Sequence, residues 1–146
     1  MAIWKTPVTI AILADIHRKT LVERIGIEFL EVGDDFIRAR MAVDERTRQP
    51  VGILHGGASV VLAETLASCA ANFAVDLAKA RCVGLEINAN HIRSVAEGHV
   101  TGIARPVHLG RTTQIWDVRI TSDDDKLVCV SRVTMAVLET PGRTGG

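Results

Sequence analysis

The longest stretch of mostly apolar residues in this sequence runs from Leu54 to Ala78, and only a few polar residues interrupt it. Three of these, Glu64, Ser68 and Asn72, follow one another at intervals of four and therefore share one face of a helix. A helix that is apolar around most of its circumference is buried in the protein. We therefore predict one long buried helix that carries a single polar stripe.

Shorter patterns on both sides of this segment predict β-strands. Apolar and polar residues alternate from Ile25 to Glu31 and from Phe36 to Val43, with a turn at Gly33-Asp34-Asp35 between them. Four further strand-like runs follow the long helix, at about Cys82–Val95, Gly98–Val107, Thr112–Thr121 and Leu127–Leu138. Because the links between these runs are short, we expect antiparallel meanders. Before the first strand, Thr9–His17 and Leu21–Gly26 predict short helices.

The order of these elements is two strands, one long helix and four strands, which is an α+β arrangement. A helix that is apolar nearly all round needs a sheet wrapped around it, so we predict a six-stranded antiparallel sheet around one central helix. The edges and outer face of such a sheet favour self-association, and we expect a homo-oligomer. The 146 residues suit a single domain, in which we expect residues 1–8 and 140–146 to fray.

Composition excludes some classes of function. The formal net charge is zero, which gives no indication of a nucleic-acid partner. Polar residues interrupt the best apolar run, so no membrane span is predicted, and the N-terminus lacks a secretory signal. We expect a cytoplasmic protein. Cys69, Cys82 and Cys129 show no CxxC spacing, so we interpret them as reduced thiols, with Cys69 a small buried apolar residue and no metal bound.

Residues around the start of the long helix suggest acyl chemistry. Glu64 could act as a general base or attack an acyl carbon, although a structural acid paired with His or Arg is an equal alternative. The Gly56 N–H and the Gln49 amide could donate to a developing oxyanion. His55 could orient the loop or bind a carbonyl group. Ser68 could hold a water molecule, or it could hydrogen-bond back to the helix.

A second group of polar residues lies in the later strands. Between Arg81 and Thr113 there are four arginines, three histidines and only two acids. The segments His91–Ser94 and His108–Thr113 combine basic side chains with hydroxyls and a glycine turn, which suits phosphate groups. Ordinary solvated charge is the alternative for any single arginine. A metal site at His91 and His108 is a weak alternative, because no HExxH-like pattern accompanies them.

Four stretches, in this order, together resemble the hotdog-fold acyl-CoA thioesterases. They are Val43–Pro50, Gly52–Glu64, Val83–His91 and His108–Arg111, and the resemblance covers about Ile3–Leu138. The likeness is to the branch that contains 1,4-dihydroxy-2-naphthoyl-CoA thioesterase and the enterobactin-pathway proofreading thioesterase. The resemblance implies a hotdog fold, and a homotetramer built as a dimer of dimers.

The resemblance also implies roles for individual residues. Glu64 would be the nucleophile or general base, and Gln49 and the Gly56 N–H would polarise the thioester carbonyl. His55 and Ser68 would position the thioester and the hydrolytic water. The site would form between two subunits, with Glu64 facing Gln49 and His55 of another chain.

Further positions match the family's substrate-binding regions. Those matched to the coenzyme A region are Gly84, His91, Ile92, Arg93, Ser94, His108, Leu109, Gly110, Arg111, Thr112 and Thr113. Cys69 and Asn72 match acyl-pocket positions. Asn72 stands where relatives often carry an aromatic residue, which predicts either weaker packing on an aryl ring or a wider pocket.

These features predict hydrolysis of an aromatic acyl-CoA, such as 1,4-dihydroxy-2-naphthoyl-CoA or a benzoyl-CoA, to a carboxylate and free coenzyme A. Coenzyme A would be part of the substrate, and no separate cofactor or metal is expected. The alternatives are proofreading hydrolysis of a misacylated carrier protein, hydration of an acyl thioester, and non-catalytic binding of acyl-CoA.

Overall fold

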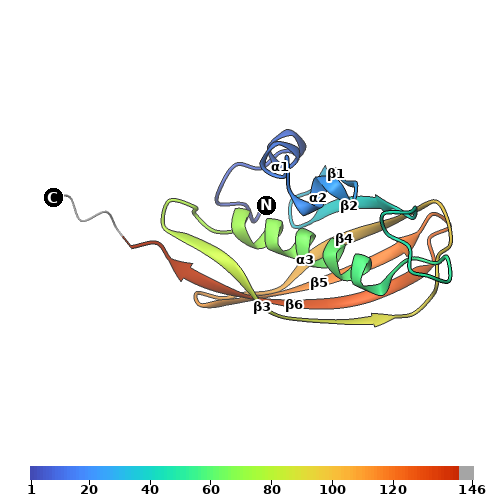
Figure 1. The fold of residues 1–146 in the computed structure, drawn as a ribbon. Helices are drawn as coiled ribbons and strands as arrows, with labels where there is room; N and C mark the ends of the chain where they lie inside the picture. The colour runs from blue at the N-terminus through green and yellow to red at the C-terminus, as the bar shows by residue number, and fades with distance from the viewer. Residues whose placement is uncertain (142–146) are drawn as a thin grey trace.

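A single six-stranded antiparallel sheet wraps around helix α3 (Gly56–Phe73) in the computed structural model, which describes residues 1–141 (Figure 1). The strands are β1 (Ile27–Val32), β2 (Ile37–Ala42), β3 (Ala80–His91), β4 (His99–Leu109), β5 (Thr113–Ser122) and β6 (Leu127–Glu139). Their order across the sheet is β1-β2-β4-β5-β6-β3. The predicted α+β architecture of sheet and central helix is therefore confirmed.

One part of the predicted topology is wrong. The β1–β2 hairpin and the β4-β5-β6 meander are present, but β3 does not pair with β4. It pairs with β6 at the far edge of the sheet, while β4 pairs with β2. The link 92–98 has seven residues and can span roughly 23 Å when extended, which exceeds the roughly 14 Å across three strand spacings. The link therefore crosses the ends of β6 and β5, and this places strands on both flanks of α3.

Helix α3 is shorter than its apolar run. Leu54 donates its backbone N–H to Val95 O, so it belongs to the loop that precedes the helix. At the other end, the helix stops at Phe73, and Asp76 accepts a hydrogen bond from the Ala78 N–H. Such local side-chain bonds compete with helical ones, which explains why apolar residues after Phe73 do not extend the helix.

The core lies between α3 and the concave face of the sheet. Leu62 and Leu66 of α3 are fully buried against β4, where Gly102 allows the close approach. A Cβ at Gly102 would lie 2.7 Å from Cδ1 of Leu66. The largest fully buried side chain, Trp116, donates from its indole nitrogen to Gln114 Oε1 at 2.9 Å. The central strands and one face of α3 thus form one continuous core.

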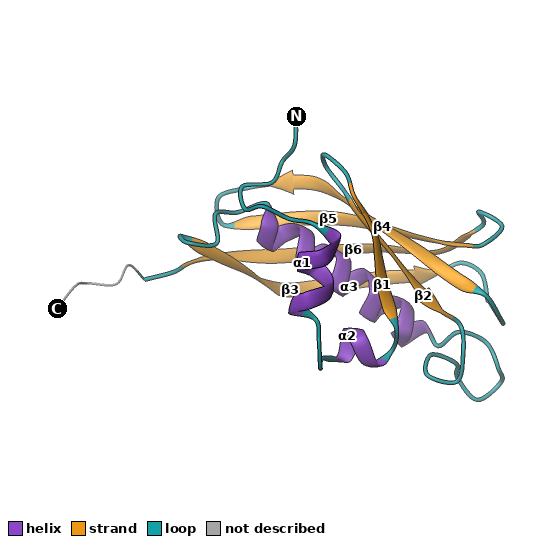
Figure 2. Ribbon diagram, turned by 90° about the horizontal axis from the view of Figure 1, so that it is seen from above, coloured by secondary structure: helices purple, strands orange, loops and turns teal. Residues whose placement is uncertain are grey.

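Two short helices, α1 (Ile10–Ile16) and α2 (Leu21–Arg24), pack against β1 on the α3 side of the sheet (Figure 2). Both were predicted. Before them, the N–H groups of Lys5 and Thr6 donate to Phe73 O and tie the N-terminal segment to the end of α3.

At the C-terminus, Thr140 donates its N–H to Lys79 O at 2.8 Å. The rest of the expected tail, residues 142–146, lies outside the described residues. Within residues 1–141, no helix has the length and apolar character needed to cross a membrane.

Candidate functional site

The loop before α3 is held firmly in place by backbone hydrogen bonds. Arg48 and Leu54 form an isolated antiparallel bridge, and Gln49 donates its N–H to Ile53 O at 2.8 Å. The Arg48 guanidinium donates twice to Ala96 O, at 3.1 and 3.2 Å, which fastens the loop to the β3–β4 link. Gln49 therefore has a fixed position beside the start of α3.

His55 is the N-cap of α3. Its Nδ1 accepts the Gly57 N–H at 2.8 Å, so that nitrogen carries no proton and the neutral ring has its hydrogen on Nε2. The Ala58 N–H donates to His55 O. In the described part of the chain the Gly56 N–H has no acceptor, so it remains available to a ligand at the positive end of the helix.

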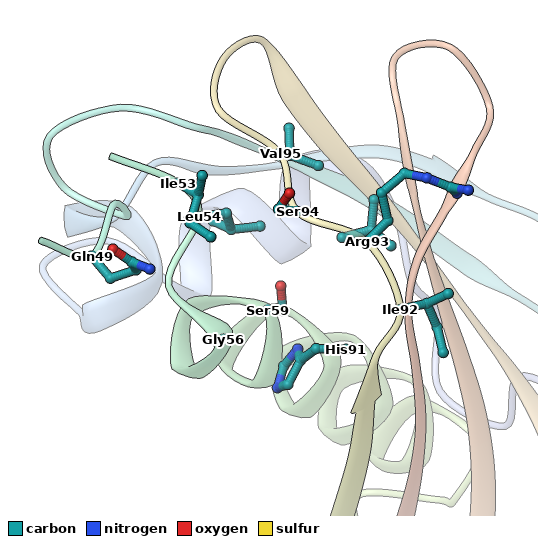
Figure 3. A pocket seen from close by; sticks show the side chains of 11 residues that line it. Gln49, Ile53, Leu54, Gly56, Ser59, His91, Ile92, Arg93, Ser94 and Val95 are labelled. Atoms are coloured by element: carbon teal, nitrogen blue, oxygen red, sulfur yellow. The ribbon is translucent and has the colours of Figure 1, made fainter. Parts of the chain in front are cut away.

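Gln49 and Gly56 open into a hollow of about 320 Å³, here called the Gln49 hollow (Figure 3). Its lining residues are Gln49, Ile53, Leu54, Gly56, Ser59, His91, Ile92, Arg93, Ser94, Val95 and Val128. The Gln49 Oε1 accepts the Val51 N–H, which leaves the amide NH₂ directed into the hollow. The predicted carbonyl donors and the predicted coenzyme A residues His91–Ser94 therefore share one space.

His91 and Arg93 are both constrained by their surroundings. The His91 ring lies against Gly56, where an added Cβ would be 2.9 Å from Nε2. Arg93 donates from Nη1 to Leu127 O at 3.1 Å, and its other donors have no acceptor within residues 1–141. The absence of a side chain at position 56 is thus required for the observed His91 position.

Glu64 lies in a second hollow, of about 410 Å³, here called the Glu64 hollow. It is lined by Leu21, Val60, Val61, Glu64, Thr65, Gly84, Leu85, Glu86 and Ile87. A Cβ at Gly84 would lie 2.5 Å from Oε1 of Glu64, so this glycine gives the carboxylate its room. The family resemblance matches Gly84 to the coenzyme A region, whereas the structure places it against Glu64.

Glu64 has no cationic partner among the described residues. The ion pairs in residues 1–141 involve other acids, all of them at least partly exposed to solvent. Partial burial of a carboxylate without a counter-charge costs free energy, and an acid kept in such a place is a candidate for a functional role. The alternative of a structural acid paired with His or Arg is therefore not supported within this chain.

One chain does not bring Glu64 together with Gln49, His55 and Gly56. Gly56 and Glu64 are separated by eight residues of α3, which corresponds to roughly 12 Å along the helix axis. They also open into different hollows. A single thioester cannot contact both groups within one copy of the chain.

The predicted acyl-pocket residues Asn72 and Cys69 do not line the Glu64 hollow. The Asn72 amide nitrogen donates to Ser68 O at 2.9 Å and to Cys82 O at 3.0 Å, and its oxygen accepts the Cys82 N–H at 2.9 Å. Asn72 thus fastens α3 to β3. Ser68, between Glu64 and Asn72 on the same face, is half-buried and lines neither hollow.

Cys69 points away from the Glu64 hollow towards α1, with its sulfur 3.7 Å from Nε2 of His17. Burial raises the pKa of the Cys69 thiol to about 12. A thiol with such a pKa stays protonated at neutral pH, which confirms its interpretation as a small buried apolar residue and excludes a nucleophile.

The two predicted phosphate-binding segments lie at opposite ends of the sheet (Figure 1). His91 pairs with Cys129 near the start of β6, whereas Thr113 pairs with Ala136 near its end, roughly 23 Å away along the strand. Gly110 and Arg111 line a separate hollow that also contains Lys5 and Lys79. Within one chain the segments His91–Ser94 and His108–Thr113 are therefore not neighbours.

The residues that sequence reasoning missed form the walls of the Glu64 hollow. Val60 and Val61 precede Glu64 by four and three positions, so helix periodicity alone could have found them. Leu21 and Leu85 come from α2 and from a bulge in β3, and no local signal predicts their meeting. Among residues 1–141, no three His, Cys, Asp or Glu side chains cluster as a metal site would require.

Comparison with known proteins agrees with this geometry. The model of the thioesterase superfamily matches residues 51–129. A 1,4-dihydroxy-2-naphthoyl-CoA hydrolase of Escherichia coli is 46% identical over 136 residues, which are 93% of this chain and 99% of the relative. The proofreading thioesterase EntH of Cronobacter turicensis is 45% identical over 137 residues, covering 93% of this chain and 98% of EntH.

Among solved structures, the Q49A mutant of thioesterase PA1618 from Pseudomonas aeruginosa superposes with a TM-score of 0.93. The match has 45% sequence identity and covers 95% of this chain and 100% of that one. Family model, full-length relatives and fold agree, and the chain therefore belongs to the thioesterase superfamily, as a thioester-hydrolysing enzyme of hotdog fold.

Proposed function

We propose that this enzyme hydrolyses an aromatic acyl-CoA thioester, with Glu64 as the nucleophile or general base. The observation that carries the proposal is the Glu64 carboxylate itself, which has no counter-charge in the described chain and opens into a largely apolar hollow. The similarity to a 1,4-dihydroxy-2-naphthoyl-CoA hydrolase supports an aromatic acyl group.

The acyl group would occupy the Glu64 hollow. Leu21, Val60, Val61, Leu85 and Ile87 supply aliphatic walls that can pack on the faces of a planar ring. Burial of such a ring is favourable in proportion to the apolar area that leaves water. The carboxylate at the floor of this hollow would then face the acyl carbon.

The carbonyl donors would come from a second copy of the chain. Strand β3 is the edge of the sheet, and its exposed Val83 and Leu85 leave an apolar edge open to pairing. In each chain Gly84 lies against Glu64 and His91 lies against Gly56. An antiparallel pairing that sets Gly84 of one β3 opposite His91 of another would therefore place Glu64 beside the second copy's Gly56 and Gln49.

The same pairing would unite the two basic segments. Thr113, Ala136 and Val83 lie in one row across β5, β6 and β3. Arg93 of the second copy would approach this row. The row begins at Thr113, next to the β4–β5 turn that contains Arg111. Guanidinium groups from two chains would then bind the phosphates of coenzyme A. We propose a symmetric dimer as the catalytic unit and a homotetramer of two such dimers.

The proposed hydrolysis needs water as its only co-reactant. Either Glu64 attacks the acyl carbon to give an acyl-carboxylate anhydride that water then hydrolyses, or it removes a proton from a water that attacks directly. In both routes the C–S bond breaks, the sulfur leaves as a thiol after protonation, and water supplies the new oxygen of the carboxylate. The Gly56 N–H and Gln49 amide would stabilise the oxyanion.

A carrier-protein thioester is a second candidate substrate. The chain is 45% identical to a proofreading thioesterase and 46% identical to a CoA-ester hydrolase, so similarity alone does not favour one carrier. Hydrolysis rates for one aryl group attached to coenzyme A and to a carrier protein would decide. A kcat/KM at least as high with coenzyme A supports the proposal, and a strong preference for the carrier protein contradicts it.

Replacement of Glu64 tests the mechanism. We expect E64Q to lower kcat for benzoyl-CoA or 1,4-dihydroxy-2-naphthoyl-CoA by roughly 10²–10⁴-fold, because the variant has neither a base nor a nucleophile. The measurement is thiol release by a chromogenic reagent. E45Q removes an exposed carboxylate that lines neither hollow and serves as the matched control, with near-normal turnover expected.

Near-normal thiol release by folded E64Q would contradict the proposed role of Glu64. Addition of water to crotonyl-CoA without release of thiol would contradict hydrolysis as the reaction and identify a hydratase.

A further inference from the structure

Ser59 is a buried hydroxyl that faces the Gln49 hollow. It is the fourth residue of α3 and is 1% exposed, yet it lines the hollow beside Gly56 and Gln49. Figure 3 shows its oxygen directed into the open space, on the side towards Ser94. Within residues 1–141 the hydroxyl makes no hydrogen bond to another residue, and its oxygen stays accessible from the hollow.

A second buried serine shows what a purely structural hydroxyl does in this protein. Ser131 of β6 is also 1% exposed, and its hydroxyl donates to Asn88 O at 2.8 Å. Burial of a hydroxyl without a partner is unfavourable, so such groups in native proteins are usually satisfied by protein, water or ligand. Ser59 lacks the protein partner that Ser131 has, so its hydroxyl is available to a molecule that enters the hollow.

The direction of the side chain sets which part of a ligand Ser59 can reach. In an α-helix each Cα–Cβ bond tilts towards the N-terminus, so the Ser59 side chain covers the turn that contains Gly56. Gly56 has no side chain, and the His91 ring lies against it. The Ser59 hydroxyl and the Gly56 backbone thus line the same hollow from adjacent positions on the first turn of α3.

The donors around this space match one kind of ligand atom. The Gly56 N–H, the Gln49 NH₂ and the Ser59 hydroxyl are uncharged donors, Arg93 is a cationic donor in the same hollow, and no carboxylate lines it. A group of neutral donors at a helix N-terminus suits an oxygen that gains negative charge during reaction. A thioester carbonyl oxygen is such an atom.

We propose that Ser59 is a substrate-binding residue whose hydroxyl donates a hydrogen bond to the thioester carbonyl oxygen, beside the Gly56 N–H and the Gln49 amide. The inference rests on the proposed function, because it needs a thioester as the substrate. Ser59 strengthens its bond as the oxygen becomes an oxyanion, so its contribution appears in kcat more than in KM.

The kinetic test compares S59A with S59T and the control S131A. We expect S59A to lower kcat about 10- to 100-fold with KM within about twofold of wild type. S59T keeps the hydroxyl and should recover part of kcat, whereas S131A should lose thermal stability but keep kcat. Circular dichroism shows that each variant is folded. An unchanged kcat in S59A, or a raised KM as its sole effect, overturns the proposal.

A binding experiment separates this inference from the role of Glu64. The probe is a CoA ketone in which CH₂ replaces the thioester sulfur and the carbonyl carbon is ¹³C-labelled, so that it cannot be hydrolysed. Donation from Ser59 predicts a downfield ¹³C shift on binding that is smaller in S59A than in wild type. An equal shift in both proteins contradicts the Ser59 bond, even when E64Q is inactive. If E64Q remains active while the ¹³C shift is smaller in S59A than in wild type, Ser59 binds the carbonyl and only the role of Glu64 is overturned.

Discussion

At the scale of single residues, the site depends on where side chains are absent as much as on where they are present. Gly84 leaves room for the Glu64 carboxylate, and Gly56 leaves room for the His91 ring. The sequence predicted Glu64, because an acid in an apolar helix stands out in the pattern. It did not predict that Asn72, on the same face, is occupied with the backbone of Cys82, because that contact joins two elements.

Replacement of Gly84 by alanine tests the contact with Glu64. The added Cβ would lie 2.5 Å from Oε1 of Glu64, so the carboxylate must move. A small displacement of a reacting group can lower the rate by orders of magnitude, and we expect G84A to reduce kcat by roughly 10- to 100-fold. N88A, on the exposed face of the same strand, is the matched control and should retain turnover. Normal kcat in folded G84A would show that the position of the carboxylate does not limit the reaction.

At the scale of elements, α3 and the loop before it carry most of the site. Periodicity predicted the helix, but its end depends on the Asp76 turn, and the position of β3 beside β6 depends on a link long enough to cross two strands. Local residue patterns predict where a helix forms, but they do not predict which strand β3 pairs with. His55 belongs to both the loop and the helix, because it is the last residue before α3 and its side chain caps the helix N-terminus.

Two substitutions separate the cap from any chemical role of His55. Asparagine is a good N-cap residue, so H55N should unfold at nearly the wild-type urea concentration, whereas H55A should lose about 1 kcal/mol of unfolding free energy. If the imidazole also positions the thioester, H55N will still show a lower kcat. Full turnover in H55N, together with normal stability, would limit His55 to capping α3.

At the scale of the whole molecule, the separation of the two hollows is the most informative result. Glu64 lies in one hollow, and Gln49 and Gly56 lie in the other. The two basic segments are likewise at opposite ends of one sheet. Residue patterns predicted self-association, and the family resemblance predicted a site between subunits. The proposed pairing of two β3 edges would bring each separated set together.

Subunit complementation tests this central claim most directly. E64Q and Q49A each damage every site of their own homo-oligomer. When the two variants are unfolded together and refolded at equal concentration, a mixed dimer with shared sites would contain one doubly damaged site and one intact site. Random pairing then predicts recovery of about a quarter of wild-type thiol release. A mixture no more active than the two variants measured separately, with mixed dimers demonstrated by mass spectrometry, would contradict a site shared between chains.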